Sequence, residues 1–337
     1  MNKKPESSMQ GSQLEVLKGC LSCLEQGEKI TLVSVAKTWG TSPRPVGSLL
    51  AVSSSGRFFG SVSGGCVEED LIEQLANTPV TFVQKIMYGE TAEERHRFGL
   101  PCGGALELIA EPLNDIEDVK FLIDHIETRK TYLRKISLET GQMSYLPWKQ
   151  QDPELTHTHW QNVFGPTWRL MVIGAGETGR YLAEFAQGLG FEVLVSDPRP
   201  DYRSNWPLTD LPLLKGFPDD IIQDLNVDVR TAIVAVAHDP KVDDMALLTA
   251  LKSDAFYVGA LGSKLNNQER RQRLMEHFDF SEAEVNQLHG PVGLNIGSKS
   301  PAEIALSILA EITAIKNGIL PNKALEKKED QISQTAA

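Results

Sequence analysis

The chain has 337 residues, of which 41% are hydrophobic and 23% are charged, and its net charge is −12. At roughly 150 residues per domain, this length suggests two domains, each large enough to bury its own core. The composition excludes a disordered or collagen-like chain, and the acidic charge offers no basic face to a nucleic acid. We find no apolar run of about 18 residues that could span a bilayer and no secretory signal, so we expect a cytoplasmic protein that binds no membrane.

Residues 12–147 are expected to form an α+β domain. Leucines at helical spacing predict a first helix that begins near Leu14 and ends near Gly27. Apolar periodicity also predicts helices over 67–76 and 116–127. Strands are predicted over 29–37, 48–52, 58–62, 81–88 and 105–112, followed by a hairpin over 132–146.

The second half of the chain has a different pattern. Residues 148–166 are polar and aperiodic, and we expect them to form a linker. Strands and helices then alternate from residue 167 to residue 320, which is typical of a parallel, doubly wound sheet. The predicted strands cover 168–173, 191–196, 231–237 and 256–259, and the predicted helices cover 177–189, 241–251, 268–278 and 301–317. The polar segment 321–337 is expected to be a disordered tail.

A glycine-rich motif follows the first strand of this second domain. Gly174, Gly176 and Gly179 form G-x-G-x-x-G between a strand and a helix, where glycines permit a tight turn and close approach of a pyrophosphate. Asp197, at the end of the next strand, could bind a ribose hydroxyl, and Arg199 could favour a 2′-phosphate. The fold class is therefore α/β: an N-terminal α+β domain followed by a Rossmann-like doubly wound sheet. The pattern leaves open whether NAD(P) or another nucleotide binds.

Two further polar residues follow the strand predicted over 231–237. His238 and Asp239 would lie at the carboxyl end of that strand, where ligands bind in sheets of this kind. His238 could act as an acid or base, or hydrogen-bond a bound phosphate or pterin. The alternative is that the pair only forms a capped turn before Pro240.

Two cysteines of the first domain lie beside paired glycines. Gly64-Gly65-Cys66 joins a predicted strand to a helix, which places Cys66 at or next to a helix N-terminus, where a thiolate is favoured. Cys102-Gly103-Gly104 is nearly its mirror image and precedes another strand. Because the glycines would admit a bulky ligand, we interpret these thiols as a functional pair. Cys20 and Cys23 fall within a helical pattern and are expected to lie in the core.

Several of these motifs, in this order, resemble those of the XdhC/CoxI family, the accessory proteins of molybdenum hydroxylases such as xanthine dehydrogenase. The resemblance covers the chain from about Leu14 to Lys316. It rests on residues 60–68 and 102–104 in the first domain, and on the Gly174 motif, His238-Asp239, Gly262-Ser263-Lys264, Arg270-Arg271 and residues 293–305 in the second.

The resemblance implies a chaperone that binds the molybdenum cofactor (molybdopterin), supports its sulfuration by a cysteine desulfurase and delivers it to the apo-hydroxylase. It identifies Cys66 and Cys102 as the thiols that contact molybdenum or a transferable sulfur. We therefore expect a cofactor chaperone rather than a turnover enzyme, and a homodimer on general grounds. The alternative is an NAD(P)-dependent oxidoreductase that uses the Gly174 loop and His238.

Overall fold

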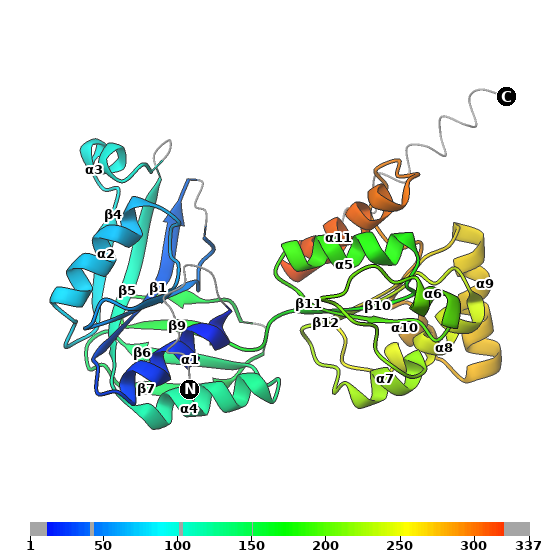
Figure 1. Ribbon diagram of the computed structural model, residues 1–337, viewed down its shortest axis with the longest axis horizontal. Coiled ribbons are helices and arrows are strands. Elements are labelled where there is room, and N and C mark those ends of the chain that lie inside the picture. Colours follow the sequence, from blue (N-terminus) through cyan, green and yellow to red (C-terminus); the bar gives the residue numbers. More distant parts are fainter. Residues whose placement is uncertain (1–11, 41–43, 101–103, 150, 320–337) are drawn as a thin grey trace. The chain divides into compact units, whose positions relative to one another are not determined.

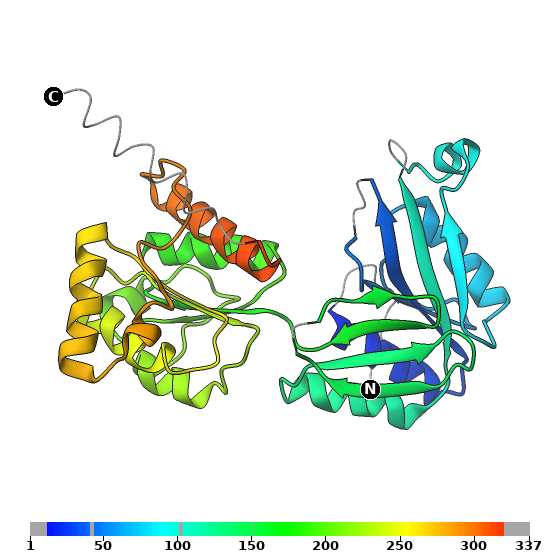
Figure 2. The ribbon, with the colours of Figure 1, turned by 180° about the vertical axis from the view of Figure 1, so that it is seen from behind.

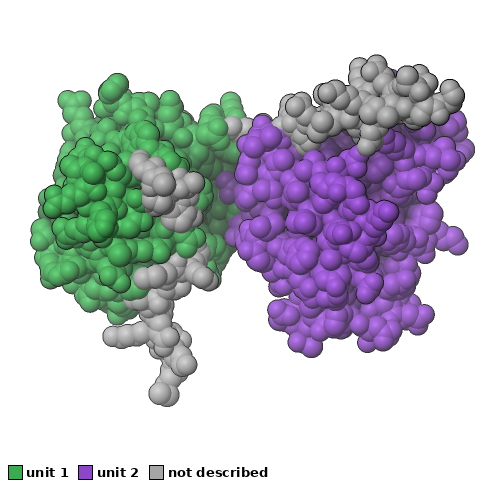
Figure 3. Space-filling model, turned by 90° about the horizontal axis from the view of Figure 1, so that it is seen from above, with its two compact units in different colours: residues 1–166 green, residues 167–337 purple. Residues whose placement is uncertain are grey.

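The computed structural model describes residues 12–40, 44–100, 104–149 and 151–319. The chain divides into two compact units, residues 1–166 and residues 167–337 (Figure 3). The second unit begins at the residue where the sequence places the start of the second domain, whereas the expected tail lies outside the described residues. Among the residues that the structure describes, no helix is long and apolar enough to cross a membrane.

The first unit contains a five-stranded antiparallel sheet, sheet A, with strand order β3-β2-β1-β5-β4 (Figure 1). Its strands are β1 (Ile30–Trp39), β2 (Leu49–Ser53), β3 (Phe58–Gly60), β4 (Gln84–Tyr88) and β5 (Ala105–Leu113). Helices cover both faces: Leu32 of β1 packs with α1 (Gln13–Leu24) and α4 (Ile116–Glu127), and Val33 packs with α2 (Cys66–Asn77). This burial explains why the sequence of β1 is apolar at successive positions.

A second sheet of this unit, sheet B, corrects the predicted linker. Its strand order is β7-β6-β9-β8, and β8 (Glu154–Leu155) and β9 (His159–Phe164) both lie within 148–166. The other two strands are β6 (Tyr132–Ser137) and β7 (Met143–Pro147), as the predicted hairpin requires. Buried and partly exposed residues alternate along β9, but one of its buried residues is Asn162, which donates to the Gly47 carbonyl at 3.2 Å. This polar residue at a buried position obscured the strand pattern.

A buried ion pair joins the two sheets of the first unit. Arg134 on β6 donates two hydrogen bonds, each of 2.8 Å, to the carboxylate of Glu111 on β5. Arg134 is 2% exposed and Glu111 is 1% exposed. The side chain of Asp118 lies 3.9 Å from Arg134 and adds a second negative charge. Arg134 Nε also donates to the Tyr145 hydroxyl at 3.3 Å, and these partners together replace the water that burial removes from the guanidinium.

The second unit is the predicted Rossmann-like doubly wound sheet. Five parallel strands run in the order β11-β10-β12-β13-β14. They are β10 (Arg169–Ile173), β11 (Glu192–Ser196), β12 (Thr231–Ala235), β13 (Tyr257–Ala260) and the short β14 (Leu288–His289). Helices α5 (Glu177–Gly188) and α11 (Pro301–Lys316) pack on one face, and α7 (Pro218–Asp224), α8 (Pro240–Ala250) and α9 (Lys264–Phe278) pack on the other (Figures 1 and 2).

Short elements account for most of the differences from the predicted pattern. The sequence did not predict α3 (Ala92–Arg97), α6 (Pro200–Ser204), α7, α10 (Glu282–Val285) or β14. Helix α9 begins four residues before its predicted start because Ser263 accepts a hydrogen bond from the N–H of Asn266 and caps it. The strand order reverses between β10 and β12, and a crevice at such a point is where ligands bind in open α/β sheets.

Candidate functional site

Cys66 is the first residue of α2, as the sequence predicts, and its side chain is exposed. The loop before it ends in Gly64 and Gly65. Gly64 adopts φ +86°, a left-handed conformation that favours glycine. A Cβ atom built on either glycine would have no atom within 4 Å. The thiol therefore stands beside open space at the start of a helix.

Glu68, two residues after Cys66, organises this loop from within. Its side chain is fully buried. Hydrogen bonds reach its carboxylate from the N–H groups of Val62, Ser63, Gly64 and Gly65 and from the hydroxyls of Ser61 and Ser63. Burial alone would raise the pKa of Glu68, but these hydrogen bonds outweigh it and lower the pKa to about 2. The loop N–H groups are thus taken by a carboxylate of the protein, so they are not available to a phosphate.

The structure does not test the pairing of Cys66 with Cys102. Cys102 and Gly103 lie outside the described residues, while Gly104 is buried immediately before β5. Within the described ranges, no three His, Cys, Asp or Glu side chains are placed to hold a metal ion. Cys20 and Cys23 are fully buried, as expected, and burial raises the pKa of both thiols.

The glycine motif of the second unit has the close contacts that its spacing predicts. A Cβ atom on Gly174, which has φ +116°, would lie 2.6 Å from the backbone of Ala237. A Cβ atom on Gly179 would lie 2.0 Å from the carbonyl oxygen of Gly174. Gly176 is less constrained, since a Cβ atom built on it would have the Tyr202 ring as its nearest neighbour, at 3.7 Å. The first and third glycines are therefore required by packing whether or not a nucleotide binds.

Asp197 and Arg199 do not fit the ribose of a dinucleotide. Asp197 is fully buried and accepts hydrogen bonds from the N–H of Ala175 at 2.8 Å and from Arg199 Nε and Nη2 at 2.9 and 2.7 Å. Burial raises the pKa of Asp197, but the hydrogen bonds from Arg199 more than offset it and lower the pKa. Arg199 also donates to the Ala237 carbonyl and lies 3.8 Å from the Tyr202 ring centroid. The acid and the arginine thus hold each other, and neither is free to bind a ribose hydroxyl or a 2′-phosphate as the sequence suggested.

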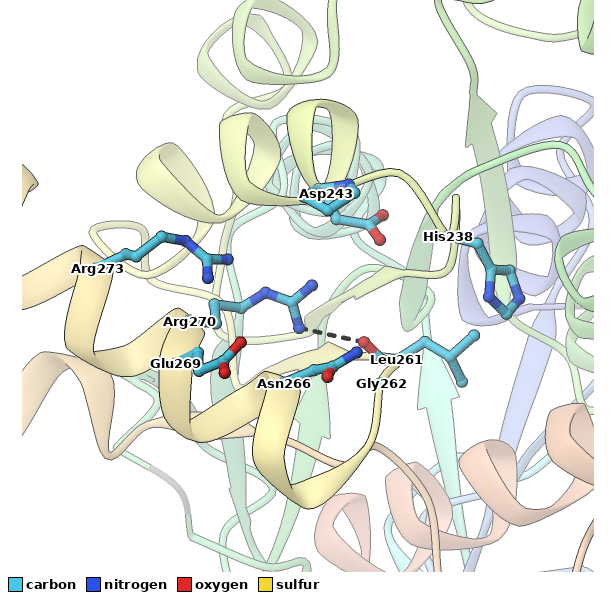
Figure 4. Close-up of a pocket in the computed structure, with 9 residues that line it drawn as sticks. His238, Asp243, Leu261, Gly262, Asn266, Glu269, Arg270 and Arg273 are labelled. Carbon is cyan, nitrogen blue, oxygen red and sulfur yellow. Dashed lines mark hydrogen bonds between the residues drawn. The ribbon is translucent and has the colours of Figure 1, made fainter.

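A pocket of about 260 Å³ lies beyond the carboxyl ends of β12 and β13 (Figure 4). Residues from the loop after β12, from α8 and from α9 line it. The polar side chains among them are His238, Asp243, Asn266, Glu269, Arg270 and Arg273. Of the residues that the sequence singled out as a ligand site, only His238 reaches this pocket.

His238 and Asp239 have different roles. Asp239 accepts a hydrogen bond of 3.0 Å from the N–H of Lys241 and so caps α8. His238 is exposed and adopts φ +57°, a left-handed conformation that costs a residue with a Cβ atom about 1–2 kcal/mol. The capped turn that the sequence offered as an alternative is therefore present, and the strained residue beside it faces the pocket.

Asp243 was not predicted from the sequence, and Arg270 was predicted only as part of the family motif. Asp243 on α8 is 2% exposed and accepts a hydrogen bond of 3.0 Å from the N–H of Ala237. Arg270 on α9 is 5% exposed; its Nε donates to Asp244 at 2.7 Å and its Nη1 donates to the Leu261 carbonyl at 3.1 Å. Figure 4 shows both side chains extending into the same pocket from different helices.

Asp243→Asn is expected to raise the free energy of unfolding by about 2 kcal/mol at pH 8. Burial is the largest cause of the rise in the pKa of Asp243 from 3.8 to about 6. The charge of Asp244 adds to this rise, and the charges of Arg270 and Arg199 only partly offset it. A carboxyl group whose pKa is raised by folding destabilises the fold progressively as the pH rises from the unfolded-state pKa of 3.8 to the folded-state value of about 6, and the destabilisation is complete above that. Urea unfolding at pH 8 and pH 5 measures this: the gain should shrink at pH 5, and an equal gain at both would contradict it.

Comparison with known proteins gives the family. A family model described as the XdhC Rossmann domain matches residues 170–312, and a model described as the XdhC and CoxI family matches residues 23–78. The two models together match more than half of the chain. The chain belongs to the XdhC and CoxI family. The first model covers the Gly174 motif, His238 and the pocket, and the second ends within one residue of the end of α2, after Cys66.

Two relatives match most of the chain. A molybdenum cofactor insertion chaperone, PaoD of Escherichia coli K12, is 26% identical over 328 residues, which cover 93% of this chain and 92% of PaoD. A probable xanthine dehydrogenase subunit of Bacillus subtilis 168 is 27% identical, covering 86% and 94% of the two chains. A crystal structure described as a xanthine dehydrogenase from Bacillus halodurans has a TM-score of 0.67 at 22% identity, covering 93% and 98%, which shows the same fold.

Proposed function

We propose that the protein is a chaperone that binds the molybdenum cofactor, supports its sulfuration by a cysteine desulfurase and delivers it to a xanthine dehydrogenase-type hydroxylase. The likeness to PaoD over nearly the full length of both chains supports binding and delivery. The observation in this protein that carries the proposal is the exposed Cys66 thiol on a loop that a buried carboxylate holds in place. Molybdenum and transferable sulfur are both soft partners for a thiolate.

The loop around Cys66 is suited to present a sulfur atom to a large ligand. The two glycines before it leave open space, and the six hydrogen bonds to Glu68 fix the backbone on which the thiol stands. A preorganised loop loses little conformational entropy when it binds, which strengthens binding. Cys20 and Cys23, by contrast, are enclosed in the core and cannot meet a ligand.

Cys66→Ser is expected to lower activation of an apo-hydroxylase by at least about tenfold, because an alcohol lacks the soft sulfur of a thiolate and cannot carry a persulfide. Losses of tenfold to a hundredfold are typical even for side chains that only support a metal ligand. The measurement is hydroxylase activity after incubation with the cofactor-loaded protein, together with molybdenum bound per chain. Cys23→Ala removes a buried thiol and serves as the control; if both variants activated the hydroxylase like the unaltered chain, the role of Cys66 would be wrong.

A further inference from the structure

Two buried side chains in the pocket of the second unit have hydrogen-bonding capacity that the described residues do not use. Asp243 Oδ1 accepts from the Ala237 N–H, and no donor from the described part of the chain reaches Oδ2. Arg270 uses Nε and Nη1, but its Nη2 has no acceptor among the same residues. Both side chains line the pocket, so these two atoms are available to a molecule bound there. An acceptor and a donor left open in one pocket indicate that a ligand completes them.

The charges around the pocket cancel. Two carboxylates, Asp243 and Glu269, line it together with two guanidiniums, Arg270 and Arg273. Asp244 accepts from both arginines at 2.7 Å and offsets their charge further. A phosphate site would need an excess of positive charge that this pocket lacks. The pocket therefore favours an uncharged group that carries donors and acceptors side by side.

The size of the pocket limits what it can enclose. Its volume of about 260 Å³ is below the roughly 300–1,000 Å³ of pockets that hold drug-sized ligands. One small ring system fits such a space better than a whole cofactor does. Asp243 and Arg270 come from neighbouring helices and extend into this space, yet Arg270 forms its ion pair with Asp244 and not with Asp243, within the part of the chain that is described.

We propose that this pocket binds the aminopyrimidinone edge of a pterin ring. The inference rests on the proposed function, whose cofactor contains a pterin. That edge offers an amino group and an adjacent ring N–H, two parallel donors that match a carboxylate, and a carbonyl oxygen that matches a guanidinium N–H. Asp243 accepts the two donors, since Oδ1 retains a lone pair beside its bond to Ala237. Arg270 donates from Nη2 to the carbonyl.

The protonation of Asp243 supports this recognition at neutral pH. Burial raises its pKa to about 6, with Arg270 and Arg199 lowering it and Asp244 raising it. Above that pH the carboxylate only accepts hydrogen bonds, as the two ring donors require. Below it the protonated carboxyl group becomes a donor, and the affinity for the ring falls.

Binding of free pterin to the full chain tests the proposal, with ring fluorescence as the readout. Asp243→Asn should weaken binding by about tenfold to a hundredfold, the range for a hydrogen bond to a charged group. Asp254→Asn removes an exposed carboxylate at the amino end of β13, the opposite edge of the sheet, and should leave binding unchanged. Lumazine, in which a carbonyl replaces the amino group of pterin, should bind the unaltered chain at least about tenfold more weakly, because it presents an acceptor to Asp243.

The outcomes separate this inference from the proposed function. Pterin binding that survives in Cys66→Ser but weakens in Asp243→Asn supports the pocket as the pterin site. Equal affinity of the unaltered chain and Asp243→Asn for pterin overturns it, as does equal binding of pterin and lumazine. If the unaltered chain binds the intact cofactor and activates the hydroxylase but Asp243→Asn does both equally well, the pocket assignment fails while the chaperone function stands. If the unaltered chain binds neither free pterin nor the intact cofactor, both the pocket assignment and the proposed function are wrong.

Discussion

Glu68→Gln is expected to lower the free energy of unfolding of the first unit by about 3 kcal/mol at pH 7. The pKa of Glu68 falls from 4.5 to about 2 on folding, and a tenfold change in a proton-binding constant corresponds to about 1.4 kcal/mol. An amide nitrogen at this position would face donors where the carboxylate accepts six hydrogen bonds. Because the folded-state pKa is depressed, the stabilisation is present above pH 4.5 and is lost as the pH falls from about 4.5 to about 2.

Urea unfolding of the full chain, followed at pH 7 and at pH 4, measures this effect. Glu69 is the natural control, because it is the next residue of α2 and is exposed, so Glu69→Gln should change stability by less than about 0.5 kcal/mol. The rate at which an alkylating reagent modifies Cys66 should also change in Glu68→Gln, since the loop that holds the thiol loses its central acceptor. Identical unfolding curves for the two variants would show that the carboxylate does not organise the loop.

Arg134→Met is expected to destabilise the first unit by about 3–5 kcal/mol. The variant leaves Glu111 buried between the two sheets without the two 2.8 Å hydrogen bonds that Arg134 donates to it. An unpaired buried charge costs this amount because the interior cannot solvate it. The expected result is a shift of the urea midpoint to lower concentration, with an unchanged slope.

The double variant Arg134→Met, Glu111→Leu provides the matched control for this pair. Replacing both charges with apolar side chains removes the unpaired carboxylate, and such replacements are often neutral or stabilising. Most of the lost stability should therefore return. A double variant as unstable as Arg134→Met would mean that the loss comes from packing around residue 134 and not from the stranded charge of Glu111.

The fold could be predicted where sequence spacing has a direct geometric meaning. The positions of Gly174 and Gly179 require close backbone contacts, and the structure has them. The strand β9 was missed because its inward-facing row contains Asn162, whose hydrogen bond to Gly47 joins residues 115 apart in sequence. Such a partner becomes visible only after folding, so the segment was interpreted as a linker.

In the candidate site, too, the residues with local sequence signals could be predicted, and those that depend on distant partners could not. The position of Cys66 at a helix start follows from the adjacent glycines and the helix periodicity, both local signals. The partner of Asp197 could not be inferred, since the motif predicts an acid there but not that Arg199 would bind it. Asp243 and Arg270 lie 27 residues apart on different helices, and only the packing of α8 and α9 brings them to one pocket.

The cancelled charges of the pocket have a consequence for the conditions under which it works. Salt weakens attraction between net charges, with a screening length of about 10 Å at 0.1 M ionic strength, but it has little effect on hydrogen bonds between buried groups and an uncharged ring. Affinity of the pocket for a neutral ring should therefore be nearly constant from low to high ionic strength, whereas a site that depended on capturing a phosphate would weaken steadily as salt is added.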